Sequence, residues 1–349
     1  MRAIALFLLK CLCTAVTILL LAAYVTGYIR PGAHFYGLTG LMYPFMVLMA
    51  VLCIVGCLLL RCKWGWLPVL ALAAGYDFLP RYAGFGRKET VHAERPEIKL
   101  MTYNVCCFSW EKNNRDNIFK YIRESEADIV CLQEALSGNL QKDIAAQLPQ
   151  YPYVQTAMYT RNAQLVLLSR HKIVRRENIR FSRGSGCAMC CDLLVGTDTV
   201  RVYTLHLNSF GFSRNEKNYI DTAPLVTRND IQWTKLKSIG AALQHGFADR
   251  SGQVDTVSAH IARSPYPVIV CGDFNDTPAS YTYRKIRGRL HDAFRTSGKL
   301  LGGTFRIRGN YALRIDYFLC DKKFAVTGYE SPHLSYSDHY PVICKLTFR

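Results

Sequence analysis

Polar side chains of catalytic types stand at the ends of several apolar runs in this 349-residue sequence. In VIVCGDFNDTP, the apolar run stops at Gly272, and Asp273 and Asn275 follow it. Residues two apart share one face of an extended backbone, so these two side chains are expected to point into one site. Similar residues end the other runs, namely Asn104, Glu134, His206 with Asn208, Asp316, and Asp338 with His339.

Carboxylates, amides and imidazoles are the groups that bind a hard divalent cation and exchange protons with water. Each residue taken alone also fits a structural role: an Asn that ends a strand is a common turn former, and Asp316 beside Arg314 fits a surface ion pair. The whole set, in this order, favours a shared site, because strand ends in a packed sheet bring distant positions to one edge.

The elements that must position these residues are visible as short apolar runs separated by turn residues. Helical spacing of apolar residues predicts helices over Asn117–Ser125 and Ile231–His245, and the second pattern continues through Val254 and Val257. Runs that are apolar on both faces beside helices favour a layered α/β or α+β domain. The predicted strands are IKLMTYNV, ADIVCLQ, AQLVLLS, TVRVYTLHL, PVIVCGD, RIDYFLC and PVICKLTF.

The N-terminal region has a different character. The uncharged runs Cys11–Ile29 and Leu41–Leu60 are each long enough to span a bilayer. The shorter run Trp64–Pro80 contains Asp77, so it fits a third span or an interfacial segment. A cleaved signal peptide is the alternative for the first run, and the second run close behind it favours a membrane anchor.

We therefore expect a membrane region over residues 1–88 with two to three transmembrane helices, a linker over 89–98 and a folded domain over 99–349. The protein is expected to be a multi-pass protein of the cell membrane, with the side of the folded domain open. The formal net charge of +17 suits an anionic partner such as a phosphate ester, nucleic acid or anionic lipid headgroups, or a generically basic surface.

The chain resembles the endonuclease/exonuclease/phosphatase superfamily of deoxyribonuclease-I-like hydrolases. The pieces that carry the resemblance are TYNV, ADIVCLQE, LLSRHKI, LHLNS, VIVCGDFND, RIDYFLC and SDHYPV, and they span roughly Lys99–Leu346. The resemblance implies an α+β fold, a four-layer α/β/β/α sandwich of two mixed sheets with helices outside, preceded here by the membrane region. The active site is expected at one rim of the sandwich.

The resemblance also implies a metal site. Glu134 corresponds to the principal ligand, Asn104 belongs to the same metal shell, and Asp338 helps to hold the metal or its water. These oxygen donors fit Mg²⁺, which keeps several waters and needs few protein ligands, with Mn²⁺ as a substitute. Neither a Cys-rich nor a His-rich cage is proposed, which disfavours structural zinc.

Catalytic roles carry over in the same way. Asp273 and Asn275 match the pair that positions the attacking water and the phosphate. His339 matches the histidine at the phosphoryl group, and Asp316 matches its orienting carboxylate. His206 matches a histidine of the deoxyribonuclease, phosphatase and sphingomyelinase branches, and the sequence leaves open which group is the general base and which the acid.

Substrate contacts are expected from Arg170 and Asn208, with a solvated hairpin as the other interpretation of Arg170. Cys106 stands where the abasic-site enzymes of the superfamily have an acid, and together with His206 this argues against abasic-site repair. The long segment Ser209–Asp230 beside His206 is expected to influence substrate choice.

The sequence thus predicts a membrane-anchored, Mg²⁺-dependent phosphoesterase that contacts the lipid bilayer through its N-terminal helices. Its substrate stays open among nucleic acid, a phospholipid headgroup and a soluble phosphate ester. The alternative is a membrane-bound binding or scaffold protein that keeps the fold without catalysis. The complete set of polar residues favours the enzyme.

Overall fold

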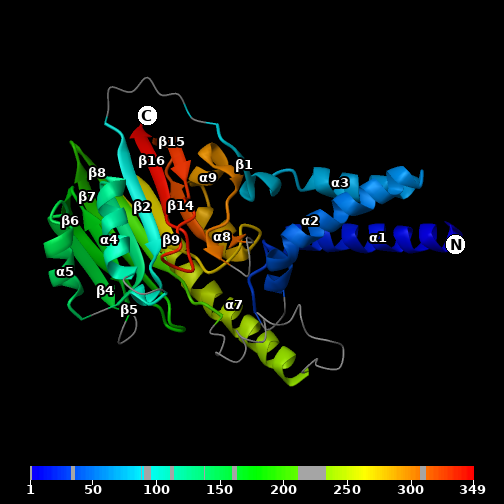
Figure 1. The fold of residues 1–349 in the computed structure, drawn as a ribbon, viewed down its shortest axis with the longest axis horizontal. Coiled ribbons are helices and arrows are strands. Elements are labelled where there is room, and N and C mark those ends of the chain that lie inside the picture. The colour runs from blue at the N-terminus through cyan, green and yellow to red at the C-terminus, as the bar shows by residue number, and fades with distance from the viewer. Residues whose placement is uncertain are drawn as a thin grey trace.

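The computed structural model describes residues 2–32, 36–87, 89, 96–110, 114–136, 138–158, 163–210, 233–306 and 312–349. Its body contains two six-stranded sheets (Figure 1). The first has the strand order β15 (Phe324–Glu330), β16 (Val342–Phe348), β2 (Ile98–Asn104), β3 (Ile129–Leu136), β5 (Ala163–Ser169) and β4 (Tyr153–Met158). The second has the order β10 (His291–Asp292), β14 (Asp316–Cys320), β9 (Val268–Asp273), β8 (Asp198–His206), β7 (Cys187–Val195) and β6 (Lys172–Ile179).

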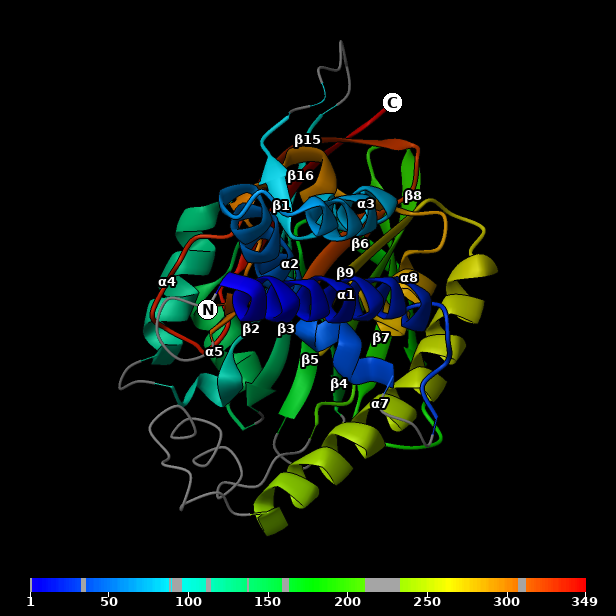
Figure 2. The same cartoon turned by 90° about the vertical axis from the view of Figure 1, so that its right-hand side faces the viewer.

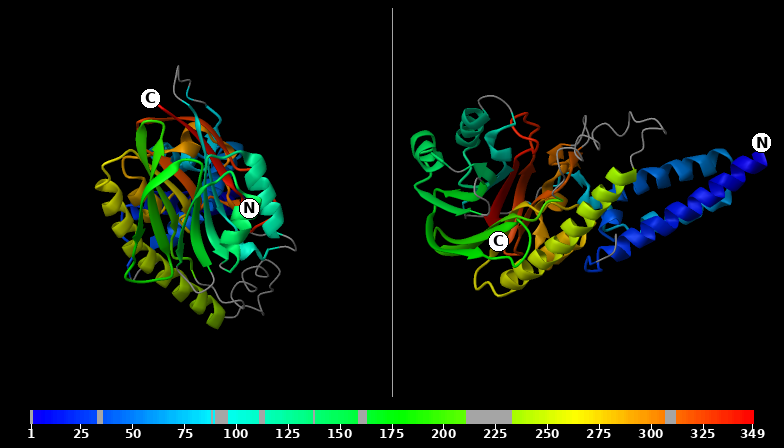
Figure 3. Two further views of the ribbon diagram at one scale, coloured as in Figure 1. Left: turned by 90° about the vertical axis from the view of Figure 1, so that its left-hand side faces the viewer. Right: turned by 90° about the horizontal axis from the view of Figure 1, so that it is seen from below.

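The two sheets pack face to face and are covered by helices on their outer faces. Apolar side chains of both inner faces form one buried cluster, with Leu100 and Leu165 from one sheet and Val202 and Ile269 from the other. A second cluster joins the first sheet to α4 (Asn114–Ser125) and α5 (Leu140–Gln147). A third joins the second sheet to α7 (Trp233–Ala262) and α8 (Tyr281–Arg287). Figure 3 shows the long helix α7, in yellow, on the outside of the body. The predicted four-layer α/β/β/α sandwich of the α+β class is confirmed.

Both sheets are mixed, as expected. The pairs β2–β3 and β8–β9 are parallel, and the other neighbouring strands are antiparallel. The central strands are buried on both faces, which explains their nearly continuous apolar sequences. The edge strand β6 instead exposes Lys172, Arg175 and Arg176, charges that discourage pairing with another chain.

Both predicted helices are present with shifted bounds. The helix expected at Asn117–Ser125 begins at Asn114. The second runs as one helix to Ala262, through the continued apolar pattern, and the expected start at Ile231 lies outside the described residues. The remaining short elements are η1 (Lys63–Gly65), η2 (Leu79–Arg81), η3 (Cys106–Phe108), α9 (Ala293–Ser297), β1 (Ala83–Phe85), β11 (Lys299–Leu301), β12 (Phe305–Arg306) and β13 (Ala312–Leu313).

The N-terminal region forms a head of three helices, α1 (Arg2–Thr26), α2 (Tyr36–Leu59) and α3 (Trp66–Ala74), which project together from one side of the body (Figures 1 and 2). By length and composition, two helical segments could cross a membrane, Arg2–Thr26 and Leu38–Leu59. The helix α3 has nine residues, or ~14 Å, and is shorter than the ~30 Å hydrocarbon core. A third span over Trp64–Pro80 therefore does not form as one helix, because the chain leaves the helix at Gly75.

The head is docked on the body by polar contacts. Asp77 binds Arg295 at 2.6 Å, and the Arg81 guanidinium donates to the Pro278 carbonyl at 3.1 Å. The Arg284 guanidinium donates to the Gly27 carbonyl at 2.8 Å. Strand β1 pairs with β11 of the body. Much of the linker expected at 89–98 lies outside the described residues. The chain contacts the body before this segment, through the pairing of β1 with β11.

One buried ion pair supports this junction. Arg314 binds both oxygens of Asp292, at 2.9 and 2.5 Å, and also donates to the Arg81 carbonyl at 2.9 Å. Both side chains are almost fully buried. Arg314 therefore pairs with Asp292, and the surface pair with Asp316 that the sequence also allowed does not form.

We predict that Arg314→Met destabilises the protein, because Asp292 is then left buried without its partner. The expected loss in the free energy of unfolding is about 3–5 kcal/mol, measured by denaturant unfolding of the full chain in detergent. The control is Arg175→Met, which removes an exposed pair with Glu177 and should change stability by less than about 1 kcal/mol. Similar small effects for both variants would contradict the role of the buried pair.

Candidate active site

The sheet topology brings the polar strand ends together at one edge. Strand β2 ends there at Asn104, which is opposite Gln133 of the parallel strand β3, and Glu134 follows Gln133 within β3. In the other sheet, β8 and β9 end side by side, with His206 opposite Asp273. The antiparallel neighbour β14 begins at Asp316, which is opposite Asp273 on its other side. His339 precedes β16, which runs antiparallel to β2, and so reaches the same edge.

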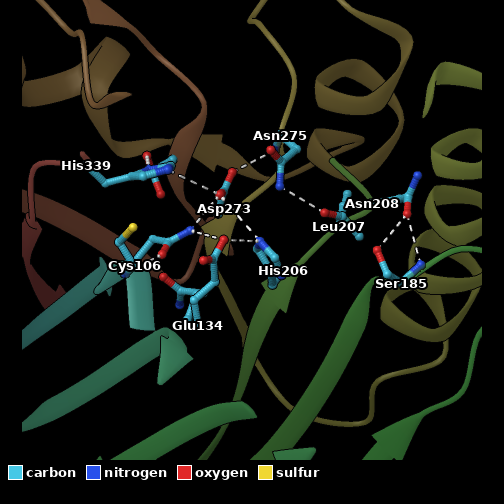
Figure 4. Close-up of polar contacts among 12 residues, drawn as sticks. Cys106, Glu134, Ser185, His206, Leu207, Asn208, Asp273, Asn275 and His339 are labelled. Atoms are coloured by element: carbon cyan, nitrogen blue, oxygen red, sulfur yellow. Dashed lines mark hydrogen bonds and ion pairs between the residues drawn. The ribbon is translucent and has the colours of Figure 1, made fainter. Parts of the chain in front are cut away.

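Asp273 lies at the centre of the site (Figure 4). One carboxylate oxygen accepts from the Asn275 backbone N–H at 2.7 Å, and the other accepts from the Asn104 side-chain amide at 3.0 Å. The second oxygen is 3.7 Å from Nε2 of both His206 and His339. Burial and the nearby Asp316 carboxylate raise the pKa of Asp273 to about 6, although both histidines favour its ionised form.

His339 and Asp316 form a buried pair. Nδ1 of His339 is 2.9 Å from a carboxylate oxygen of Asp316. Thr304 fixes the start of β14 by accepting from the Asp316 backbone N–H at 3.0 Å. Burial lowers the pKa of His339, but Asp316 and Asp273 outweigh it and raise this pKa to about 10. His339 is therefore a cation at neutral pH with Nε2 directed at Asp273.

Glu134 and His206 form a second pair at the mouth of the site, 3.2 Å apart. Burial opposes ionisation of Glu134, but His206 and the amide of Asn104 together lower its pKa to about 2. The side chain of Glu134 stays 31% exposed, whereas that of Asp273 is 1% exposed. Glu134 is therefore a permanent, accessible anion.

Two site residues have unusual backbone conformations. Glu134 and Asn275 both have a backbone φ of 52°, in the left-handed region that residues other than glycine rarely adopt. Glu134 lies where the pairing register of β3 with β5 shifts, between Leu132 and Ala135. Such a bulge re-aims a side chain, here toward the edge where the other polar groups meet.

A cavity of about 260 Å³ opens beside these groups, lined on its polar side by Glu134, Asp273, Asn275, Asp338 and His339. Its oxygen donors are of the kind that a hard divalent cation prefers, so the residues fit the implied metal. The side chains of Asp273, Asp316 and His339 also lie close enough, within 4.8 Å, to hold an ion. Asn104 turns its NH₂ to Glu134 and Asp273, and its oxygen accepts from the Cys106 N–H.

Two residues expected to bind substrate lie away from this cavity. Arg170 follows β5, which runs antiparallel to β3, so it lies beside the start of β3 and pairs with Asp128 at 3.5 Å. Glu134 is near the other end of that strand. The side chain of Asn208 accepts from the N–H and hydroxyl of Ser185, at 2.9 and 3.0 Å, and points away from Asp273 (Figure 4). The structure therefore brings neither side chain to the reacting groups.

A buried ion pair behind the site was not predicted from the sequence. Arg250 of α7 is fully buried and lies 3.3 Å from Asp276, which also accepts from Thr282 at 2.7 Å. Asp276 follows Asn275 directly, so this pair fixes the loop that carries Asn275. The VIVCGDFNDTP stretch showed the extra acid, but nothing in the sequence around Arg250 indicated its partner.

The profile of the endonuclease/exonuclease/phosphatase family matches residues 101–339, and the chain belongs to this family. It is a metal-dependent hydrolase of phosphate esters, the class that the fold and site define. A domain of unknown function (DUF8431) matches residues 5–82, the head. Among curated proteins no sequence matches the chain.

Several solved structures share the fold. They include humanized TDP2 of D. rerio (TM-score 0.53, 17% identity, 72% of this chain and 98% of that chain). The human Nocturnin catalytic domain with bound sulfate matches with TM-score 0.52 and 18% identity, over 73% and 96%. An endonuclease/exonuclease/phosphatase family protein of Bacteroides thetaiotaomicron matches with TM-score 0.53 and 16% identity, over 73% and 96%. At these identities the likeness shows the fold alone.

We predict that Asp316→Asn moves the titration of His339 down toward or below its usual pKa of 6.5, because the carboxylate at Nδ1 is lost. In the unchanged, metal-free protein the ring should stay protonated through neutral pH. The measurement is the ¹⁵N shift of the ring nitrogens in histidine-labelled protein. Asp321→Asn, after the other end of β14, is the control and should leave the titration in place. Titration near 6.5 in the unchanged protein would contradict the pairing.

Proposed function

We propose that this chain is a membrane-anchored phosphoesterase that hydrolyses a phosphodiester or phosphomonoester bond by attack of water, with Mg²⁺ as its metal and Mn²⁺ as a substitute. The observation that carries this proposal is the alternation of charge at one sheet edge. Two imidazoles, His206 and His339, flank the buried carboxylate of Asp273, and Glu134 presents a second carboxylate to the cavity. An anionic substrate requires such an arrangement.

Different side chains accept and donate the protons that hydrolysis requires. The oxygen of water bonds to phosphorus while the bond from phosphorus to the leaving oxygen breaks. Asp273, with a pKa of about 6, is mostly ionised at neutral pH and accepts a proton from the water. His339 faces the phosphoryl group as a cation held by Asp316, and His206 or His339 supplies a proton to the departing oxygen.

The remaining polar residues bind and orient. Glu134, with Asp338 and Asn104 beside it, is the proposed metal site, and a bound Mg²⁺ supplies neutralisation of the developing negative charge. Asn275 lines the cavity next to Asp273, and its amide is oriented by a hydrogen bond to the Leu207 carbonyl at 2.9 Å. We propose that it positions the substrate phosphate.

Membrane anchoring is the part of the proposal that rests on the head. Both candidate spans have a mean hydropathy of 2.5, and most of their residues are not buried within the protein. Exposed aromatic residues stand near both ends of the helical bundle, with Trp64 and Trp66 at one end and Tyr28 and Tyr76 at the other, as in interfacial belts. Helix α1 packs in one cluster with α2 and with Ala279 of the body, which favours an anchor over a cleaved leader.

A non-catalytic scaffold is the alternative, and the site geometry weighs against it. A scaffold has no need for a buried carboxylate held against two imidazoles, an arrangement that costs desolvation energy. Nucleic acid stays open as a substrate. One similar structure is D. rerio TDP2 complexed with a single strand DNA product.

We predict that the full chain in detergent hydrolyses p-nitrophenyl phosphate or bis(p-nitrophenyl) phosphate only with a divalent metal. Chelation should abolish release of nitrophenolate, and Mg²⁺ or Mn²⁺ should restore it. Asp273→Asn should lower kcat by ~10²–10⁴-fold, because the proton acceptor is lost. Asp321→Asn is the matched control, since Asp321 lies next to the opposite end of β9, its N–H 2.8 Å from the Val268 carbonyl.

Two outcomes would contradict the proposal. The first is no hydrolysis of either ester with any metal by folded protein, which would favour the scaffold. The second is equal activity of Asp273→Asn and Asp321→Asn, which would remove Asp273 from the reaction.

A further inference from the structure

The cavity beside Asp273 has a second, apolar side. The side chains on it are Leu41, Phe210, Phe247, Phe305, Leu313 and Ile315. Phe247 is almost fully buried and packs edge to face against Phe210, with ring centroids 5.0 Å apart. A phosphate group needs only the polar side, so the apolar side indicates that the substrate carries an apolar part next to its phosphate.

Leu41 connects this apolar wall to the membrane helices. It is the sixth residue of α2 and lies ten residues after Pro31. Between the two helices the chain contacts the body: Arg284 donates to the Gly27 carbonyl after α1, and Ser251 donates to the Pro31 carbonyl. Gly40, just before Leu41, lies against the loop of Thr277 and Ala279. A Cβ on Gly27 would lie only 2.6 Å from the Ala279 carbonyl oxygen. The loop that follows Asp273 and Asn275 is thus packed directly on the ends of both candidate spans.

The same side of the body has features of a bilayer interface. The ribbon of β1 and β11 carries three strongly exposed apolar side chains, Phe85 at 86%, Leu300 at 82% and Leu301 at 77%. Figure 2 shows β1 on the face from which α1, α2 and α3 project. Tyr28 is exposed there, with the Arg284 guanidinium 4.4 Å from its ring centroid. Exposed apolar and aromatic residues at the base of membrane helices are typical of contact with the lipid surface.

Basic residues stand beside these apolar ones. Helix α8 carries Arg284, Lys285 and Arg287 in its last turn. A surface cavity of about 500 Å³ next to Pro80 is lined by Arg287, Arg289, His291, Arg295 and Lys322. Basic groups at the membrane end of an anchored domain attract anionic headgroups. This charge would hold the body, and with it the catalytic cavity, close to the bilayer surface.

We propose that the substrate is an amphiphilic phosphate ester presented by the bilayer. Its phosphate binds at Asp273 and His339, and its apolar chain lies against Leu41, Phe210 and Phe247. This inference rests on the proposed phosphoesterase function and narrows its substrate class. Leu41 favours an amphiphilic ester over nucleic acid as the substrate. Bases stack on aromatic rings, but their binding does not need an apolar cavity side that continues into the membrane helices.

The test is a series of esters that differ only in chain length. If the protein hydrolyses diesters, the probes are the p-nitrophenyl diesters of methyl, hexyl and dodecyl phosphate. If it hydrolyses only monoesters, the probes are methyl phosphate, hexyl phosphate and dodecyl phosphate. The protein is the full chain in nanodiscs with Mg²⁺. Burial of a methylene favours binding by roughly fourfold, so kcat/KM should rise at least about tenfold from methyl to hexyl even with partial burial.

Two variants assign the effect to the wall. Leu41→Gln should reduce the ratio of kcat/KM for the hexyl and methyl esters to less than about a third of its value in the unchanged protein, because a polar group then faces the chain. The matched control is Met42→Gln, the same change one residue along α2 at an exposed position outside the cavity lining. Its ratio should equal that of the unchanged protein.

A further arm tests the source of the substrate. For this arm the full chain is reconstituted in phosphatidylcholine vesicles instead of nanodiscs. The dodecyl ester is placed either in those vesicles or in separate phosphatidylcholine vesicles that contain no protein. Presentation in the same bilayer should give a rate at least about tenfold higher, because the tethered cavity reaches its own membrane. Equal rates would overturn presentation by the bilayer.

The outcomes separate this inference from the proposed function. Hydrolysis of the methyl ester with no gain for the hexyl ester would leave the phosphoesterase and overturn the amphiphilic substrate. A single-stranded oligonucleotide with a higher kcat/KM than the hexyl ester would do the same. Hydrolysis of none of the esters would overturn both proposals together.

Discussion

The structure of the site depends on one buried carboxylate. Asp273 is removed from water, and removing an anion from water is costly unless other groups replace its hydration. Its oxygens accept hydrogen bonds from the Asn275 backbone and the Asn104 amide, and two imidazoles stand 3.7 Å away. These partners come from both sheets, so Asp273 is satisfied only when the two sheets are in register with each other.

The sandwich is built to keep that register. Beneath the site, Gln133 of β3 donates to Thr102 of β2 at 3.0 Å and to Thr204 of β8 at 3.2 Å, and so joins one sheet to the other through the core. A buried amide with satisfied partners permits few alternative arrangements. On the outer side, the pair of Arg250 and Asp276 fixes the loop after Asp273. The site is thus held from below and from behind, and its open side is the cavity.

Much of this could be predicted from the sequence, and particular residues show why the rest could not. Alternation of apolar runs with turns gives the strands, because this signal is local. Asp273 and Asn275 do meet at the site, but Asn275 follows the end of β9 in a left-handed conformation, so a turn and not extended period-two spacing brings it there. The partner of Arg314 was not predictable, since Asp316 is only two residues away, whereas Asp292 is 22 residues away and is brought to Arg314 by the fold. Arg170 belongs to a motif of the resemblance but lies beside Asp128, near the start of β3 and away from Glu134, because strand direction decides which edge of the sheet a residue reaches. The bulge that turns Glu134 into the site depends on pairing with β5, which no local pattern encodes.

The central claim is that Glu134 and its neighbours hold one divalent cation beside Asp273. The most direct test is calorimetric titration of Mn²⁺ into the metal-free full chain in detergent, with Glu124→Gln, on the exposed face of α4, as the control. The account predicts binding of a single ion per chain that Glu134→Gln abolishes and Glu124→Gln leaves in place. Binding that is equal in the unchanged protein and in Glu134→Gln, or no binding in either, would contradict it.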